Sequence, residues 1–570
     1  MNLDGAWAWR RARTFQDTKL TPGREAKLEG ELEAVEAQLK NTVTQLAADR
    51  ALYHCLDRMT AGQKQALSAY ASAMGNAGKG MTALGKRHLK NARSAMREAR
   101  AAVPAWVMPI KQVAEMIDPE PDAFDVVIVD EASQVGLDGL MLLWLAPRII
   151  VVGDDKQCVP FYTGGKHERF DERLDSLLPH LIDWQRDGLS PKSNLYALLS
   201  ARFTETIRLT EHFRCMPEII KWSSAQFYPD NELVPLRQYG ADRLRPLEVV
   251  HVHEGHCEGR RETLVNRPEA ERIVAKLQEL AEDEAYAKRS FGVIVLRSGH
   301  QTRLLENLID TRIDPAIRER HNIRVGTAEQ FQGDERDVIL LSLVIDADNT
   351  RALTGQGDGR RFNVAASRAR DQMWLFTSVT PDQLRSRDLR HSLLTYMQAP
   401  PELQGTSPSL SAVSTDEQCE PFESLFEQRV FCKIKKRGYH VVPQWKVSGK
   451  RIDLVVVGEA GRLAVECDGS PYHSTPDQIR DDYERERELR RAGWQFWRVR
   501  SSEFALSPED SLAPLWKRLD ALGIRPGVTE EGQGDTGNGW APVEMDDADL
   551  TTDELDAMLD EDASVSLEGA

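Results

Sequence analysis

The sequence has few cysteines, no long apolar run and no targeting segment. Its seven cysteines include no CxxC pair, which argues against a disulfide framework or a zinc ribbon and favours reduced thiols in the cytoplasm. The longest apolar run, Gly139 to Val152, is broken by Pro147 and Arg148 and falls short of the roughly 20 residues of a membrane span. Because Met1 is not followed by an apolar segment, no secretory signal is predicted. We expect a cytoplasmic protein without a membrane partner.

The length of 570 residues with 41% hydrophobic content predicts three or four domains. The formal net charge of -17 argues at first against nucleic-acid binding, but much of the acid lies beyond Gly527, and residues 526–570 are predicted to be a disordered acidic tail. Basic clusters remain elsewhere, and each is either a nucleic-acid contact or a solvated helix face. These clusters are Lys86 to Arg100, Arg360 to Arg370, Lys433 to Arg437 and Arg485 to Arg500.

Residues 1–102 predict a helical arm or insertion. Apolar residues recur at spacings of three and four after Pro22, which is typical of a helix with one apolar seam. The seam consists of Leu28, Leu32, Val35, Leu39, Val43 and Leu46. Gly62 is expected to interrupt this helix, and a loop at 75–80 to precede a basic helix at 81–102. An antiparallel hairpin folded on itself and a coiled-coil dimer both fit this pattern.

From Phe124 onward, short β-branched runs alternate with helical patterns, which indicates parallel-sheet α/β structure. Strands are predicted at 126–129, 149–152, 292–296, 323–325, 338–343 and 373–376, and helices at 217–227, 268–284 and 301–312. The predicted domains are 103–200 and 201–398, followed by a linker at 399–421 rich in Pro, Ser, Thr and Gly. A smaller mixed α/β domain is predicted at 422–525.

Two segments in the first of these domains point to nucleotide chemistry. An apolar strand, expected to be buried, leads from Phe124 into Asp130-Glu131-Ala-Ser-Gln134, and the segment 152–157 reads Val-Gly-Asp-Asp-Lys-Gln. Taken alone, the first is also ordinary helix-start chemistry and the second an ordinary turn. They resemble motifs II and III of superfamily 1 helicases. In that family the position of Asp130 orders Mg²⁺, that of Glu131 activates the attacking water, and that of Gln157 senses the γ-phosphate.

Three later segments continue the resemblance in the same order. Leu-Thr-Glu-His-Phe-Arg at 209–214 resembles motif IV, 325–335 resembles motif V, and Arg-Phe-Asn-Val-Ala-Ala-Ser-Arg-Ala-Arg at 361–370 resembles motif VI. The resemblance implies that Arg214 reaches phosphate and that Arg368 is the arginine finger, since a guanidinium neutralises charge on a transferring phosphoryl group. Salt bridges are the structural alternative for each arginine alone. Further residues implied at the nucleotide or the nucleic-acid strand are Gln134, Gln332, Gly333 and Glu335.

Together these segments resemble the RNA-surveillance-factor-like, DNA2/NAM7-type helicases, which implies two RecA-like lobes, ATP and Mg²⁺. No convincing phosphate loop accompanies them. The segment 80–87, Gly-Met-Thr-Ala-Leu-Gly-Lys-Arg, fits G-x₄-G-K but has Arg87 where a hydroxyl should bind magnesium, and no strand precedes it. We interpret it as chance. The resemblance then implies a helicase truncated at its amino end, with an incomplete first lobe and a phosphate loop supplied from outside, for example by a partner chain.

A cluster of acids in the last domain follows from hairpin geometry. Two apolar strands flank Gly-Glu-Ala-Gly at 458–461, which predicts a four-residue loop. If Val457 pairs with Arg462, Asp453 lies directly opposite Glu466, and Asp468 points to the same face. Such a group can hold a hard cation. A solvent-exposed acidic edge is the alternative.

This domain resembles the PD-(D/E)xK nucleases, specifically the very-short-patch-repair-like (MTES_1575/DUF559-type) branch. The matching segments are Ser-Leu-Phe-Glu ending at Glu427, the strand at 438–444, and Glu466-Cys-Asp-Gly-Ser-Pro-Tyr-His473. Asp468 stands where the general pattern has lysine, so His473 or a metal-bound water would transfer protons. A structural role for this loop histidine is equally open.

The combined prediction is a DNA helicase–nuclease fragment that uses ATP and Mg²⁺ and acts on single-stranded or junction DNA, with RNA as an alternative. Predicted metal ligands are Asp130, Glu427, Asp453 and Glu466. The competing hypothesis is a non-hydrolysing nucleic-acid-binding or scaffold subunit that a partner chain completes with the phosphate loop.

Overall fold

The computed structural model describes 3–19, 24–77, 82–117, 120–157, 167–182, 186, 188–190, 193–203, 205–240, 243–260, 263–297, 299–400, 407–410, 413–447, 450–458, 461–469, 486–527 and 542–543. His473 and nearly all of the predicted acidic tail lie outside these residues. The chain divides into two compact units, Met1–Val152 and Gly153–Ala570. In the part of the chain that is described, no helix is long and apolar enough to cross a membrane.

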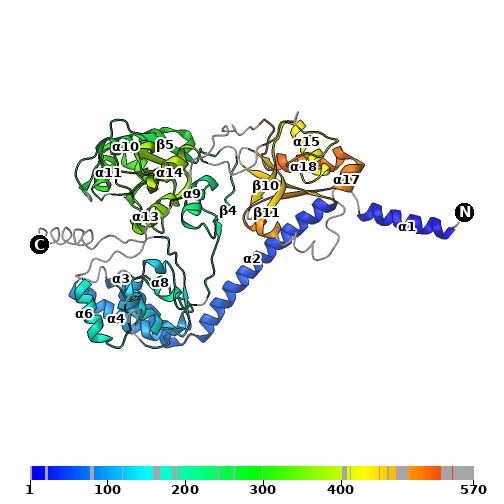
Figure 1. Cartoon of the computed structure of the whole chain (residues 1–570). Helices are drawn as coiled ribbons and strands as arrows, with labels where there is room; N and C mark the ends of the chain where they lie inside the picture. Colours follow the sequence, from blue (N-terminus) through cyan, green and yellow to red (C-terminus); the bar gives the residue numbers. More distant parts are fainter. Residues whose placement is uncertain are drawn as a thin grey trace. The chain divides into compact units, whose positions relative to one another are not determined.

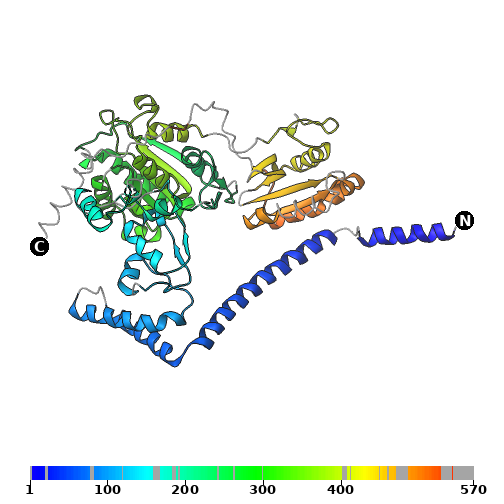
Figure 2. The same cartoon turned by 60° about the horizontal axis from the view of Figure 1, so that its bottom comes forward.

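The first unit is mainly helical (Figure 1). Its elements are α1 (Leu3–Lys19), α2 (Arg24–Arg58), α3 (Ala61–Ala77), α4 (Ala83–Ala99), η1 (Arg100–Ala102), α5 (Ile110–Met116), β1 (Val127–Val129), η2 (Ala132–Gln134), η3 (Leu137–Trp144) and β2 (Ile149–Val151). Figure 2 shows α2 as one unbroken helix. The break after it falls at residues 59–60, so Gly62 belongs to the first turn of α3 and does not interrupt the arm as predicted.

The helical hairpin of this unit is built by α3 and α4. Ala73 and Ala92 are buried where these helices pack, together with Met116 of α5. Small side chains allow the two backbones to approach closely. The predicted seam of α2, by contrast, is exposed, with fractional exposures between 47% and 61% from Leu28 to Leu46. The hairpin is therefore formed by α3 and α4, and α2, which carries the apolar seam, is not part of it.

The described part of the first lobe contains a two-stranded parallel sheet, with Val127 paired to Ile149 and Val129 to Val151. The expectation of a buried strand before Asp130 is wrong for much of its length, because Ile128 is 65% exposed. A strand is buried when neighbouring strands and covering helices enclose both of its faces. Within the described residues of this unit, two strands alone provide too little cover.

The second unit contains a complete five-stranded parallel sheet in the order β5-β9-β8-β6-β7. Its strands are β5 (Leu247–His251), β6 (Phe291–Val295), β7 (Arg324–Thr327), β8 (Arg336–Ser342) and β9 (Ala369–Thr377), beside the short pair β3 (Glu211–His212) and β4 (Val234–Pro235). The helices are α6 (His167–Leu177), α8 (Leu195–Ser200), α9 (Pro217–Phe227), α10 (Arg267–Glu282), α11 (Gly299–Arg312), α12 (Pro315–Arg320), α13 (Gln356–Ala366) and α14 (Leu389–Gln398), with single turns η5 (Glu284–Tyr286), η6 (Glu329–Phe331) and η7 (Pro381–Gln383).

Both faces of this sheet are covered, as expected for a RecA-like lobe. Along β8, Val338 and Leu340 join the core formed with α10 and α11, while Ile339 and Leu341 join the core formed with α9, α13 and α14. The alternation of strand side chains thus feeds two separate cores. The predicted parallel α/β architecture is confirmed.

The remaining domain has a mixed sheet in the order β10-β11-β12-β13, in which only β12 and β13 are parallel. Its elements are α15 (Leu425–Lys436), β10 (His440–Val447), β11 (Lys450–Val457), β12 (Arg462–Asp468), β13 (Phe496–Arg500), α17 (Ser501–Leu506) and α18 (Pro508–Ala521). Helices α15 and α18 cover the face that carries Leu454 and Val465. The predicted pairing of Val457 with Arg462 is confirmed.

The segment predicted as a linker belongs in part to this domain. Val413 is buried in the core beneath α15, and the Gln428 side chain donates hydrogen bonds to the carbonyls of Ser414 and Glu417. The many Pro, Ser, Thr and Gly residues of this segment fit an irregular backbone that side-chain hydrogen bonds hold in place. Only its residues 401–406 and 411–412 lie outside the described structure.

Candidate functional site

The acidic pair after β1 sits on a tight turn. Glu131 has a left-handed backbone with φ of 51°, and the Asp130 carboxylate accepts its N–H at 2.9 Å. The Gln134 amide donates to the Glu131 carboxylate at 3.1 Å. The strained turn after the strand is typical of a functional position, and it groups the three predicted residues of the first unit.

In the second unit, the predicted phosphate sensor and the predicted arginine finger touch. Arg368 Nη2 donates to Gln157 Oε1 at 2.9 Å, and its Nε donates to the carbonyl of Val364 at 3.2 Å. Arg368 is almost fully buried. An arginine in such a site keeps its charge and presents a fixed fork, so the segment at 153–157 and the end of α13 form one polar site.

A tyrosine that the sequence reasoning did not assign joins this site. The Tyr228 hydroxyl, just beyond α9, donates to Asp154 Oδ2 at 2.6 Å and accepts from Asn363 Nδ2 at 2.8 Å. Asn363 also donates to the carbonyl of Lys156. Burial raises the pKa of Tyr228, and Asp154 raises it further, so the hydroxyl remains a donor. Its partners Asp154 and Asn363 lie inside the segments that resemble motifs III and VI, whereas Tyr228 lies outside the motif segments given above.

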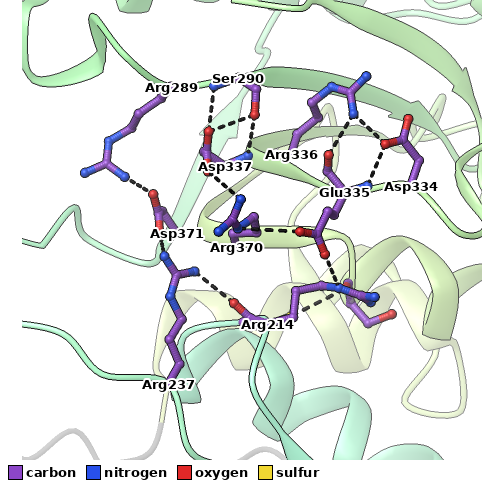
Figure 3. A network of polar contacts seen from close by, with 12 residues as sticks. Arg214, Arg237, Arg289, Ser290, Asp334, Glu335, Arg336, Asp337, Arg370 and Asp371 are labelled. Atoms are coloured by element: carbon purple, nitrogen blue, oxygen red, sulfur yellow. Dashed lines mark hydrogen bonds and ion pairs between the residues drawn. The ribbon is translucent and has the colours of Figure 1, made fainter. Parts of the chain in front are cut away.

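A second polar network links motifs IV and V (Figure 3). Arg214 Nε donates to Glu335 Oε2 at 2.6 Å, and Arg214 Nη1 reaches the carbonyl of Ser367 at 3.4 Å. Arg370 pairs with Glu335 at 3.7 Å and with Asp337 at 3.6 Å. The predicted residues Arg214 and Glu335 are therefore brought together, as ion-paired neighbours.

The motif IV strand also carries a histidine held neutral. Burial lowers the pKa of His212 to about 4, and the positive charges of Arg214 and Arg368 lower it further. Its Nε2 accepts the N–H of Cys215 at 3.1 Å. Burial raises the pKa of Cys215 to about 12. Neither side chain is set up for proton transfer near neutral pH, so the charge at this site comes from the arginines.

Gln332 and Gly333, predicted at the strand-binding face, follow the single turn η6. Gly333 has φ of 76°, a conformation that favours glycine. Glu329 at the start of this turn pairs with Arg361 of α13 at 2.8 Å. Motifs V and VI are thus connected by a charge-assisted hydrogen bond as well as by the sheet.

The described part of the candidate phosphate loop, residues 82–87, forms the cap and first turn of a helix. Thr82 caps α4 by accepting the N–H of Gly85, and Gly85 and Lys86 lie in the first turns of that helix. The element before it is helix α3, whereas phosphate cradling uses a strand-to-helix turn. The interpretation of the whole segment as a chance match stays a prediction.

In the smaller domain, the predicted helix acid is buried and bonded. Ser424 caps α15 by accepting the N–H of Glu427 at 3.1 Å. The Glu427 carboxylate accepts from the Gln444 amide and from the N–H of Glu423, each at 2.9 Å. Burial raises the pKa of Glu427 to about 7; the Gln444 bond opposes this rise, and the charge of Asp453 adds to it.

The other acids gather around Cys467. Asp453 Oδ2 accepts the N–H of Cys467 at 2.8 Å. The recorded register ends at Leu454 with Val465, so the next pair in the same register is Asp453 with Glu466. Burial raises the pKa of the Cys467 thiol, and the charges of Asp453, Glu427, Glu466 and Asp468 raise it further. The charges of four carboxylates therefore act on this one thiol.

Asp468 faces a cation from the neighbouring strand. Arg498 Nη1 donates to Asp468 at 3.2 Å, and Arg498 Nε donates to Glu486 at 2.9 Å. Burial disfavours the charged form of Arg498, but Glu486 and Asp468 outweigh this effect and raise its pKa. Arg498 pairs in register with Glu466. Among the described residues, no three His, Cys, Asp or Glu side chains are grouped closely enough to hold a metal ion.

Comparison with known families identifies the two parts of the second unit. An AAA domain model (AAA_12) matches residues 192–380, and the REase_MTES_1575 model matches residues 426–519. The chain therefore combines a superfamily 1 helicase-type domain with a restriction-endonuclease-like domain.

Relatives are helicases of greater length. An uncharacterized ATP-dependent helicase of Mycoplasma genitalium is 29% identical over 356 residues, covering 58% of this chain and 30% of that protein. Its Mycoplasma pneumoniae homolog is 27% identical, covering 72% and 38%. The DNA replication ATP-dependent helicase/nuclease dna2 of Schizosaccharomyces pombe is 24% identical, covering 45% and 19%. The chain thus spans about a third of the first two relatives. The solved PRRSV helicase is 18% identical, covers 44% of this chain and 34% of its own, and has a TM-score of 0.21.

Proposed function

We propose that the helicase-type part of this chain is an ATP-dependent motor on DNA. The observation that carries the proposal is the contact between Arg368 and Gln157 at 2.9 Å, because it joins two side chains that both have a role at the γ-phosphate in the helicase resemblance. Arg214 stands in the same polar region through Ser367. Guanidinium groups of this kind stabilise the charge of a phosphoryl group in transfer.

ATP turnover with and without single-stranded DNA tests the motor. With the phosphate loop provided by a partner chain or an extended chain, DNA should stimulate turnover, and Arg368→Ala should reduce it by about 10³-fold or more. Arg272→Ala, which alters an exposed arginine paired with Glu279, is the control. Equal turnover by the Arg368 variant would reject the motor site.

We also propose that the restriction-endonuclease-like domain is a Mg²⁺-dependent phosphodiesterase that cleaves DNA. Glu427, Asp453 and Glu466 would hold the ion, which supplies an activated water and charge stabilisation when bound. The register that sets Asp453 opposite Glu466 and the hydrogen bond from the Cys467 N–H to Asp453 support the proposal, although among the described residues no three acids are grouped closely enough to hold an ion as they stand. Their carboxylates now accept hydrogen bonds from Gln444 and from the Cys467 amide, so binding of a cation would exchange these partners for the metal.

Incubation of the full chain with linear and junction DNA tests cleavage. Mg²⁺ should produce cuts that EDTA suppresses, and Asp453→Asn, which preserves the size and the acceptor of the side chain, should abolish them. Glu509→Gln changes an exposed acid that pairs with Lys433 at 2.6 Å and should cut normally. Equal cleavage by the Asp453 variant would refute this site.

One observation favours a second candidate, a non-hydrolysing DNA-binding subunit. The G-x₄-G-K segment lies at the start of helix α4, and in this alternative a partner chain carries the phosphate loop. ATP turnover by this chain alone would reject the alternative. Turnover by the complex with the partner that Arg368→Ala leaves unchanged would support it, because this alternative gives the present chain no catalytic residue.

A further inference from the structure

The restriction-endonuclease-like domain contacts the helicase-type lobe through a buried arginine, Arg462, at the start of β12. Its guanidinium carbon lies 3.9 Å from the ring centre of Tyr239, which belongs to the lobe, and 4.6 Å and 4.9 Å from those of Trp494 and Trp445 of its own domain. Three aromatic rings around one desolvated cation give a strong and directional contact.

Hydrogen bonds and apolar contacts complete the junction. Arg462 Nη2 donates to Gln238 Oε1 at 3.1 Å and reaches the carbonyl of Arg237 at 3.4 Å. Leu236 of the lobe is buried in the core that also contains Trp445. At Gly493, φ is 90° and an added Cβ would lie 3.1 Å from the Gln238 side chain. The segment 234–239, defined here as the junction segment, is therefore packed against the second domain as part of its core.

The junction segment is also bound to the motor site. Val234 and Leu236 donate their N–H groups to the carbonyls of Thr210 and His212, each at 2.8 Å. These two residues lie in the motif IV segment. Arg237 donates to the carbonyl of Arg214 at 2.9 Å and forms an ion pair with Asp371.

Figure 3 shows Arg237 between Asp371 and Arg214, and Arg214 beside Glu335. A continuous series of contacts thus leads from Glu335 through Arg214 and Arg237 to Arg462. Glu466 lies four residues beyond Arg462 on the same strand.

We propose that the junction segment fixes the nuclease-like domain to the lobe as one rigid body, with Arg462 as the positioning residue that connects β12 to the motif IV arginine. Changes at Arg214 when a nucleotide binds would then be transmitted to the strand that carries Glu466. The transmission step rests on the proposed motor function, whereas the rigid junction does not. If the covalent connection alone joined the motor and the nuclease, the two would move independently, since a flexible linker transmits no fixed geometry.

Hydrogen exchange on the full chain tests the junction without requiring activity. Tyr239→Ala removes the ring on the lobe side and leaves Arg462 with its two tryptophans. Exchange should rise at least tenfold in residues 234–239 and 461–469, while β6 and β8 stay protected and show that the lobe is folded. Lys288→Ala, at an exposed lysine of the same lobe, should change neither. Unchanged exchange at 461–469 in the Tyr239 variant would overturn the junction.

Transmission is tested by adding a non-hydrolysable ATP analogue to the chain assembled with its phosphate-loop partner. The analogue should change exchange at 461–469 in the parent chain and leave it unchanged in Tyr239→Ala, with binding checked by a fluorescent nucleotide. Binding with no change at 461–469 would overturn transmission. Absence of binding would overturn the proposed motor and the transmission step with it, while the first experiment still decides the junction.

Discussion

At the scale of single residues, Glu269 of α10 is a carboxyl group in the interior of the lobe. It is fully buried, and its Oε1 accepts from the Ser342 hydroxyl at 2.5 Å and from the N–H of Val344 at 3.1 Å. Burial raises its pKa to about 8 from the ordinary value of 4.5, although these hydrogen bonds oppose the rise. A carboxyl group buried in this way is accommodated as the neutral acid.

The raised pKa of Glu269 leads to a prediction of how the free energy of unfolding depends on pH. Its folded pKa lies above its unfolded pKa, so its contribution is complete below about pH 4.5 and is lost as the pH rises toward 8. The loss by pH 8 is on the order of 4 kcal/mol. Glu269→Gln keeps the acceptor and cannot ionise. Denaturant unfolding should therefore show the variant more stable than the parent at pH 8.5 and similar to it at pH 5. A pH dependence equal to that of the parent would contradict this expectation.

Tyr228 gives a second prediction at this scale. Tyr228→Phe removes the bonds to Asp154 and Asn363 and leaves a half-buried carboxylate and a buried amide without that partner. We expect a loss of about 1–3 kcal/mol and faster hydrogen exchange at residues 153–157. Tyr286→Phe, which removes one hydroxyl bond to Gln372 on the far side of the lobe, is the matched control and should leave 153–157 unaffected.

At the scale of elements, prediction from sequence succeeded where pattern and local chemistry agreed. The helix Pro217–Phe227 was predicted at its observed bounds, since proline at the first position and a regular apolar face both favour it. Helix α13 was missed because Gly357, Gly359 and adjacent charges oppose helix formation, and packing of Phe362 and Val364 overrides them. Strand β5 was missed because it is a half-buried edge strand.

The candidate site was predictable to the same extent. Arg214 and Glu335 come from segments that resemble helicase motifs IV and V, so the resemblance indicated that they belong to one site, where they form a hydrogen bond. The hairpin register of β11 and β12 followed from loop length alone. The aromatic surroundings of Arg462 could not be predicted from the sequence, because its three aromatic partners come from distant segments of the chain. No periodicity in the sequence indicates which of its arginines is desolvated by such an arrangement.

The helical arm leads to a prediction that compares two sets of residues: the buried contacts of the α3–α4 hairpin and the exposed apolar seam of α2. Ala92 is fully buried between α3 and α4, whereas Leu39 of α2 is exposed. Ala92→Leu should cost about 1–3 kcal/mol through overpacking, and Leu39→Gln should change stability by less than about 0.5 kcal/mol. Hydrogen exchange of α3 and α4 measures both. A large effect of the Leu39 variant would mean that the seam is covered in solution.

At the scale of the whole molecule, we expect the acidic residues beyond Val543 to oppose nucleic-acid binding by charge repulsion. Residues 544–570 carry 11 acidic and no basic side chains, so their removal changes the net charge from -17 to -6. Val543 itself is held by the Gln226 amide, which donates to its carbonyl at 2.6 Å and accepts its N–H at 2.9 Å. The residue that precedes the acidic stretch is therefore held by the helicase-type lobe, and we expect the charge of the stretch to act on an approaching phosphate backbone.

A chain ending at Val543 should bind single-stranded DNA several-fold more tightly at low salt, and the difference should shrink above about 0.3 M salt because screening shortens the range of charge repulsion. Fluorescence anisotropy with a labelled oligonucleotide measures this. A full-length variant with the 11 acids changed to Asn and Gln controls for chain length and should bind like the truncated chain. If the neutral tail binds like the parent, repulsion by the acids is not the cause, and any gain on truncation would come from removing a steric obstacle.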